Sequence, residues 1–180
     1  DKLDSVGNTT AAIGKGNAIG AAAFATVALI MSYIGSYPAS DFSDSRTIVA
    51  VIGGAIVGAG LIEYFTALLT DNTIKAAKDL ADAGAKQLRE NPAILEGKVK
   101  PDYKSIITKA SDDALHHMFV PAVLALIVPV VFGFVFGPDF ILGLLGGSTI
   151  VAIRGALFMG NSGGAFDNAK KYIEAGMLHK

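Results

Sequence analysis

The chain consists mainly of long apolar segments, which are separated by short groups of helix-breaking residues. The breakers are Gly35-Ser36-Tyr37-Pro38, Asn91-Pro92 and Gly137-Pro138-Asp139. The segments between them predict four helices, over residues 3–34, 45–90, 103–136 and 140–176. We therefore expect an all-α fold, with residues 1–180 forming a single helix-bundle fragment.

Two of the apolar segments are free of charge over lengths that suit a membrane. Residues 16–40 and 118–138 contain no Asp, Glu, Lys or Arg, and each is long enough to cross a hydrocarbon core of about 30 Å. Residues 47–70 carry only Glu63 and residues 140–166 carry only Arg154. The pattern predicts a polytopic membrane protein, with four transmembrane helices that extend into the cytoplasm and belong to a larger bundle in the lipid bilayer.

Composition and charge support this class and add an orientation. The 180 residues are 52% hydrophobic, with 21 Gly, no Cys and a mean hydropathy of +0.49, which is unusual for a soluble domain. Thiolate metal sites are excluded, and no nucleic-acid partner is expected. Eight Lys and Arg lie within residues 75–109, which places that joint, and with it both chain ends, on the cytoplasmic side. Because the chain opens on Asp1 without a basic leader, we expect it to be an internal piece of a longer polypeptide.

Pairs of glycines four residues apart predict close helix packing, although the sequence does not say which helices meet. These pairs are Gly16/Gly20, Gly54/Gly58, Gly143/Gly147 and Gly160/Gly164.

A charged motif ends the last apolar segment. Asp167, Lys170, Lys171 and Glu174 are spaced at i, i+3, i+4 and i+7, so a helix would carry a carboxylate for a hard cation and two ammonium groups for phosphate oxygens. The alternative is a positively charged helix end whose lysines extend to the membrane surface.

The first predicted helix carries a polar column. Asp4, Asn8, Ala11 and Lys15 share one helical face that descends towards the membrane. The alternative is a water-exposed helix extension in which the Lys15 side chain reaches back to the surface.

Three blocks of the chain resemble, in order, the membrane-bound ion-pumping pyrophosphatases. They are Gly7-Asn8-Thr9-Thr10-Ala11-Ala12-Ile13-Gly14-Lys15-Gly16, then Pro101-Asp102-Tyr103, then Asn161-Ser162-Gly163-Gly164-Ala165-Phe166-Asp167-Asn168-Ala169-Lys170-Lys171-Tyr172-Ile173-Glu174. The resemblance covers essentially the whole chain. It implies that the chain corresponds to the four helices before the last helix of the pump, and that this fragment alone is inactive.

The resemblance implies hydrolysis of inorganic pyrophosphate at a cytosolic Mg²⁺ site, coupled to outward transport of H⁺ or Na⁺. Asp167 would bind Mg²⁺, Lys170 would contact pyrophosphate, and Asn8 would line the same site; Lys171 is the further candidate for the phosphate oxygens. The membrane would be the cell membrane of a prokaryote or an acidic organelle of a eukaryote. The pump would be a homodimer whose remaining helices come from the rest of the polypeptide.

The same resemblance implies dependence on K⁺. Potassium-requiring members have Ala and Gly at the positions of Ala11 and Gly14, where potassium-independent members have Lys and Thr. Lys15 corresponds to the position below the site that couples hydrolysis to the ion gate.

Glu63 and Arg154 depart from the family pattern in a complementary way. Counted from the outer ends of their helices they lie about 17 and about 15 residues deep, or roughly 22 to 26 Å. Their matched depth predicts a structural ion pair; the alternative is that one of them faces the ion path or a subunit interface. The alternative for the whole chain is a non-catalytic multi-helix membrane component or degenerate homologue.

Overall fold

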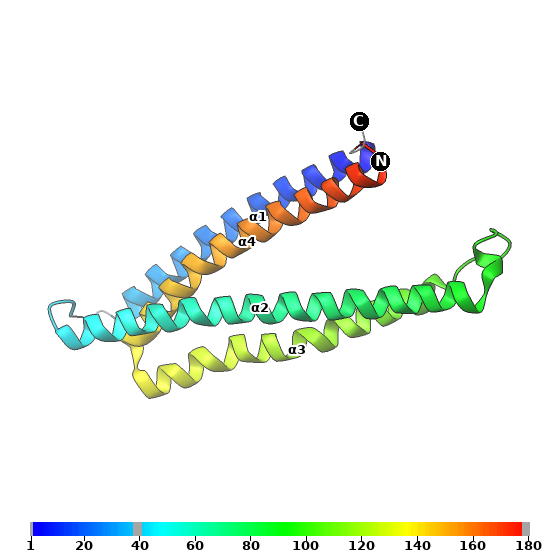
Figure 1. Ribbon diagram of the computed structural model, residues 1–180. Coiled ribbons are helices and arrows are strands. Elements are labelled where there is room, and N and C mark those ends of the chain that lie inside the picture. The colour runs from blue at the N-terminus through cyan, green and yellow to red at the C-terminus, as the bar shows by residue number, and fades with distance from the viewer. Residues whose placement is uncertain (1, 38–40, 178–180) are drawn as a thin grey trace. The chain divides into compact units, whose positions relative to one another are not determined.

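The computed structural model describes residues 2–37 and 41–177, which form four long helices and one short 3₁₀ helix (Figure 1). The helices are α1 (Lys2–Ser36), α2 (Ser45–Glu90), η1 (Pro92–Ile94), α3 (Tyr103–Phe136) and α4 (Pro138–Glu174). The described residues contain no strand, so the predicted all-α class is confirmed. All four long helices are long and apolar enough to cross a membrane. The expected breaker residue Pro38 lies outside the described residues.

Acidic side chains cap the N-termini of two helices. The Oδ1 of Asp44 accepts a hydrogen bond from the backbone N–H of Arg46 at 2.9 Å, at the start of α2. Before α3, the Oδ1 of Asp102 accepts one from the N–H of Ser105 at 3.1 Å, and this bond lowers the pKa of the Asp102 carboxyl. Both contacts satisfy N–H groups that the first helical turn leaves unpaired.

The junction between α3 and α4 is a single glycine. Gly137 has a φ of +83°, which is readily available only to a residue without a Cβ. Pro138 follows as the first residue of α4, so the helix starts two residues before the expected Phe140, because the fixed φ of proline suits this position. The other end comes at Glu174, two residues early, where Gly176 turns the chain with a φ of +70°.

The chain forms two compact units. The first contains Asp1–Ile62 and Phe132–Lys180, and the second contains Glu63–Val131. The expectation of a single bundle over residues 1–180 stays a prediction.

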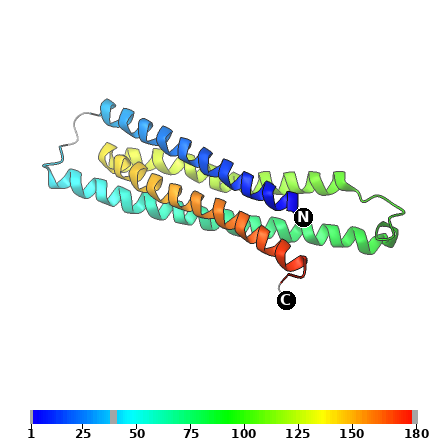
Figure 2. The ribbon, with the colours of Figure 1, turned by 90° about the horizontal axis from the view of Figure 1, so that it is seen from above.

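The first unit is built on contacts of α4 with α1 and with the beginning of α2. Figures 1 and 2 show α1 and α4 side by side along most of their lengths. The hydroxyl of Tyr33, near the end of α1, donates a hydrogen bond to the carbonyl of Pro138 at 3.1 Å. The buried core of this unit lies beside that contact and consists of Phe140, Ile141 and Leu144, against which Tyr33, Ala50, Phe132 and Leu145 pack.

Glycines allow α2 and α4 to approach backbone to backbone. A Cβ added to Gly54 or Gly58 of α2, or to Gly143 or Gly147 of α4, would lie less than 3.0 Å from backbone atoms of the opposite helix. Two of the predicted glycine pairs therefore face each other. This is close packing by small residues of the kind that joins helices in membranes.

The other two glycine pairs differ from each other. A Cβ on Gly164 would lie 3.5 Å from the Cβ of Ala12, so the Gly160/Gly164 pair faces α1. A Cβ on Gly16 or Gly20 would meet nothing within 4 Å in the described part of the chain. The spacing of glycines alone therefore did not identify the pairs that make contacts.

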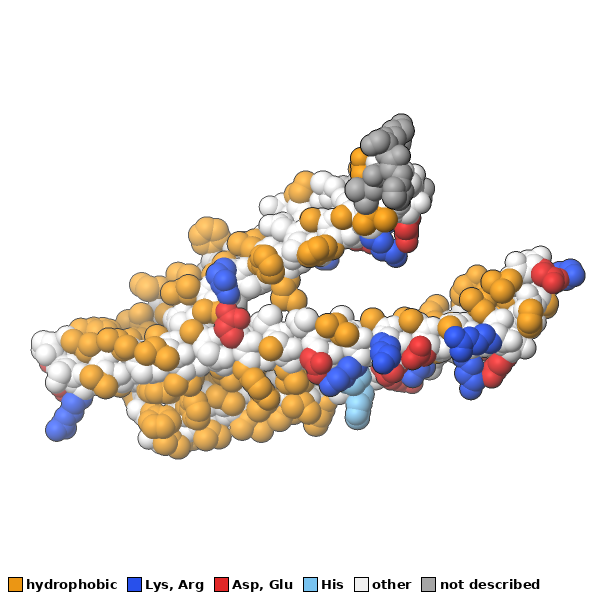
Figure 3. All heavy atoms as spheres, viewed as in Figure 1, with side chains coloured by type: hydrophobic (Ala, Val, Ile, Leu, Met, Phe, Trp, Pro, Cys, Tyr) orange, Lys and Arg blue, Asp and Glu red, His pale blue; other side chains and the backbone are white. Residues whose placement is uncertain are grey.

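The second unit joins the later part of α2 to α3. The amide of Gln87 bonds both the carbonyl and the N–H of Asp102, at 3.1 and 3.2 Å, and the amide of Asn72 donates to the carbonyl of His117 at 2.9 Å. Acidic and basic side chains are interspersed along this part of α2 (Figure 3), and Lys75 and Asp71 form an ion pair at 2.5 Å. This amphipathic, polar segment matches a helix extension outside the bilayer.

Candidate functional site

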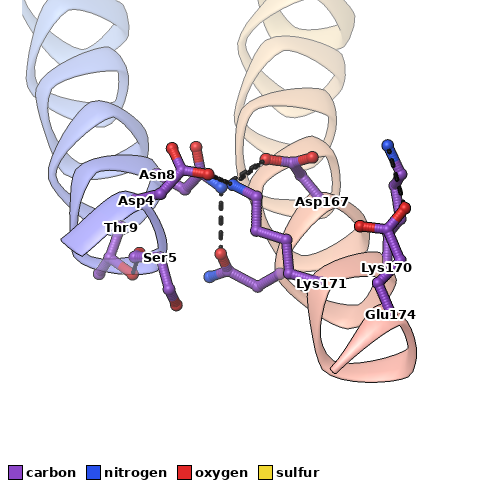
Figure 4. A network of polar contacts seen from close by, with 9 residues as sticks. Asp4, Ser5, Asn8, Thr9, Asp167, Lys170, Lys171 and Glu174 are labelled. Atoms are coloured by element: carbon purple, nitrogen blue, oxygen red, sulfur yellow. Dashed lines mark hydrogen bonds and ion pairs between the residues drawn. The ribbon is translucent and has the colours of Figure 1, made fainter. Parts of the chain in front are cut away.

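The beginning of α1 and the end of α4 meet at one end of the first unit (Figure 4). The helices come close there: a Cβ on Gly164 would be in van der Waals contact with α1, 3.8 Å from the carbonyl oxygen of Asn8. The short amide side chain of Asn8 can consequently reach α4. The two motifs singled out in the sequence are thereby brought into direct contact.

Asn8 bonds to two neighbouring residues of α4. Its Nδ2 donates a hydrogen bond to the Oδ2 of Asp167 and a second to the Oδ1 of Asn168, the latter at 3.1 Å. Because both bonds use the amide nitrogen, the amide oxygen of Asn8 takes no part in them and can accept or ligate.

Lys171 connects the same two helices. Its ammonium forms ion pairs with Asp4 on α1 and with the Oδ2 of Asp167, the latter at 2.9 Å. These residues lie in the terminal turns of α1 and α4, beyond the apolar stretches. The hydrogen bond from Lys171, and then that from Asn8, lowers the pKa of Asp167, while Asp167 and Asp4 raise the pKa of Lys171. Both groups are therefore charged at neutral pH.

Lys170 lies on a different side of α4. It pairs with Glu174 at 3.6 Å and its side chain is 68% exposed, compared with 21% for Lys171. The four predicted residues of this motif therefore form two separate pairs (Figure 4), because consecutive residues of an α-helix are rotated by about 100°. Lys170 remains open to a ligand that approaches from solvent.

The chemistry of the site fits a contribution to Mg²⁺ binding. Asp167 offers a carboxylate and Asn8 an amide oxygen, which are ligand types that Mg²⁺ accepts. The described residues contain no group of three or more His, Cys, Asp or Glu side chains placed to hold a metal. Mg²⁺ commonly uses one or two carboxylates together with substrate phosphates and water, so one carboxylate from this chain is compatible with such a site.

The residues expected to govern K⁺ dependence lie further along α1. Lys15 is on the side facing α4, since its Cβ would lie 4.0 Å from a Cβ on Gly160. Ala11 and Gly14 are exposed, and a Cβ on Gly14 would meet nothing within 4 Å. Their roles stay predictions.

Glu63 and Arg154 belong to different units. The predicted ion pair between them therefore also stays a prediction.

Asp4, Asn8, Asp167, Asn168 and Lys171 form a polar cluster between α1 and α4. Two of these residues were not expected as partners. The sequence places Asp4 in the polar column of α1 without indicating that it pairs with Lys171, and Asn168 was not a candidate. The available signals were the four-residue spacing of Asp4 and Asn8 and the position of Asn168 directly after Asp167.

Comparison with known proteins identifies the family. A family model described as inorganic H⁺ pyrophosphatase matches residues 1–180. The K⁺-stimulated pyrophosphate-energized sodium pump of Thermotoga maritima is 46% identical over 99% of this chain and 26% of its own length. The K⁺-insensitive pyrophosphate-energized proton pump of Methanosarcina mazei is 42% identical over 98% of this chain and 26% of its length.

A plant protein extends the comparison. The pyrophosphate-energized membrane proton pump 3 of Arabidopsis thaliana is 37% identical over 99% of this chain and 24% of its own length. This chain spans about a quarter of the length of the curated relatives that it matches. Because the family model covers every residue, the chain belongs to the inorganic H⁺ pyrophosphatase family of membrane proteins.

Proposed function

We propose that this chain forms part of a membrane pump that couples hydrolysis of inorganic pyrophosphate to transport of H⁺ or Na⁺. The observation that carries the proposal is the contact of Asn8 with Asp167 across α1 and α4, in a chain matched by the family along its whole length. The relatives named above are described as pyrophosphate-energized pumps. In this proposal the cluster at the helix ends is one wall of the pyrophosphate site, on the cytosolic side.

The residues of the cluster have complementary tasks in such a site. The Asp167 carboxylate and the Asn8 amide oxygen are the groups that would hold Mg²⁺, and Lys170 would reach a phosphate oxygen from its exposed position. Bound Mg²⁺ would offset the negative charge on the phosphoryl oxygens during hydrolysis. The carboxylates that orient the attacking water are expected elsewhere in the polypeptide, so this segment alone is expected to be inactive.

We also propose that hydrolysis depends on K⁺, as the residues Ala11 and Gly14 indicate. Relatives with K⁺-stimulated and with K⁺-insensitive activity both match the chain at more than 40% identity, so overall similarity does not discriminate between them. We infer the dependence from two positions, because α1 carries no ammonium at position 11 or 14 that could replace a bound monovalent cation. Lys15 is proposed to couple the site to the membrane part of the pump.

The test is pyrophosphate hydrolysis by the full-length protein in membranes, measured with and without Mg²⁺ and K⁺. Hydrolysis that requires Mg²⁺ and rises with K⁺ is expected, together with accumulation of H⁺ or Na⁺ in sealed vesicles. Absence of hydrolysis under all conditions would favour the alternative of a non-catalytic membrane component. Chemical cross-linking in the same membranes would test the expected homodimer.

A further inference from the structure

Lys170 and Lys171 are consecutive but have different surroundings. The Lys171 side chain is 21% exposed and bridges Asp4 on α1 and Asp167 on α4, whereas Lys170 is 68% exposed and reaches Glu174 on its own helix. Of the two, Lys171 connects the helices that form the site (Figure 4). Its ammonium pairs with two carboxylates, one on each helix.

The contacts to Asp167 converge on one carboxylate oxygen. The ammonium of Lys171 and the amide of Asn8 both bond Oδ2, and neither bonds Oδ1. A carboxylate held through one oxygen presents the other in a defined direction. Carboxylates that bind metals are commonly oriented by hydrogen bonds of this kind from neighbouring side chains.

Stability does not explain the arrangement well. The side chain of Asp4 is 64% exposed and that of Asp167 is 45% exposed, and ion pairs at such positions contribute little to folding. The consequence of the two pairs is geometric, because they fix the direction of the Asp167 side chain relative to α1.

We propose that Lys171 and Asp4 are positioning residues of the pyrophosphate site. Lys171, anchored by Asp4, holds the Oδ2 of Asp167 and leaves Oδ1 as the oxygen that would bind Mg²⁺. This inference rests on the proposed function and replaces the expectation that Lys171 binds phosphate. Asp4 acts through Lys171, and neither residue touches pyrophosphate.

The experiment uses the full-length protein and four variants: Lys171→Met, Lys171→Arg, Asp4→Asn and Asp4→Glu. The readout is the rise in melting temperature with increasing Mg²⁺, measured without pyrophosphate. KM and kcat for pyrophosphate are measured separately at saturating Mg²⁺. The matched control is Lys86→Met, which removes an exposed lysine that pairs with Glu90 four residues away.

Lys171→Met is expected to raise the Mg²⁺ concentration for half of the melting shift by about tenfold, and Asp4→Asn to raise it less. The conservative variants Lys171→Arg and Asp4→Glu keep the charges and should restore most of the response. The control should behave like the wild type.

Three outcomes in the variants would overturn the proposal. An unchanged or tighter Mg²⁺ response in Lys171→Met would show that the lysine does not position a ligand. A raised KM for pyrophosphate with an unchanged Mg²⁺ response would assign Lys171 to the substrate instead. Failure of both conservative variants to restore the response would show that the charges are not what matters.

The readouts also separate this inference from the proposed function. If the wild-type protein binds Mg²⁺ but hydrolyses no pyrophosphate, the proposed function fails while the melting shifts still test Lys171 and Asp4. If the wild type hydrolyses pyrophosphate and Lys171→Met retains a normal Mg²⁺ response, the function stands and the positioning role is lost. A wild type whose melting temperature does not respond to Mg²⁺ contradicts the positioning role directly.

Discussion

Gly143 of α4 lies directly against the backbone carbonyl of Val51 on α2, with no room for a side chain between them. The contact recurs one helical turn along α4, where Gly147 faces the backbone of Ala55, and the facing glycines of α2 reciprocate it. Lipid chains are as apolar as the helices, so association of this kind depends on close packing. Its disruption therefore has a predictable cost.

Gly143→Ala is expected to destabilise the full-length protein by about 1–3 kcal/mol, because the new methyl group would push α2 and α4 apart. Thermal unfolding in detergent or lipid measures the effect. Gly146→Ala is the matched control, since a Cβ there meets nothing within 4 Å; alanine favours the helix, and no loss is expected. Equal stability of the two variants would contradict the packing argument.

Asp167→Ala should abolish pyrophosphate hydrolysis by the full-length protein, because it removes the carboxylate proposed to bind Mg²⁺. Steady-state hydrolysis at several Mg²⁺ concentrations is the measurement. Normal activity of this variant would end the assignment of Asp167 as a metal ligand.

Lys170→Ala should have a different effect, mainly a higher KM for pyrophosphate or slower turnover, because it removes one positive charge beside the substrate rather than the metal ligand. The kinetics of this variant are compared with those of Asp167→Ala at saturating Mg²⁺. Unchanged KM and kcat would remove Lys170 from the site.

Ala11→Lys should give activity without added K⁺, because the new ammonium would replace the bound cation. Hydrolysis in K⁺-free buffer, compared with hydrolysis at saturating K⁺, measures this. A wild-type protein that is equally active in both buffers would show that Ala11 and Gly14 do not indicate potassium dependence.

A double-mutant cycle tests the predicted pair of Glu63 and Arg154. Replacing either residue alone, as Glu63→Gln or Arg154→Met, should destabilise the protein by about 2–3 kcal/mol, because a charge left at this depth in the bilayer is costly. Replacing both should cost less than the more harmful single change. A double variant no more stable than the worse single variant would exclude the pair.

The sequence by itself determined the helices and the membrane class. Long runs without charge can satisfy their backbone polar groups in a bilayer only as helices, and the breakers Asn91-Pro92 and Gly137-Pro138 mark where α2 and α3 end. The start of α4 at Pro138 lies two residues before the expected Phe140, because Gly137 alone makes the turn and Pro138 is already the first residue of the helix. The motifs that carry the family resemblance were likewise visible without a structure.

Only the tertiary structure decided which of these residues meet. Asn8 and Asp167 lie 159 positions apart, and neither helical spacing nor composition reports the proximity of two helices. The same limit applies to the glycine pairs, of which Gly54/Gly58 packs on α4 while Gly16/Gly20 meets nothing nearby. Periodicity within a helix specifies a face, but the identity of the element opposite that face depends on packing between distant segments. Packing therefore decided that Lys171, and not Lys170, faces Asp4 on α1.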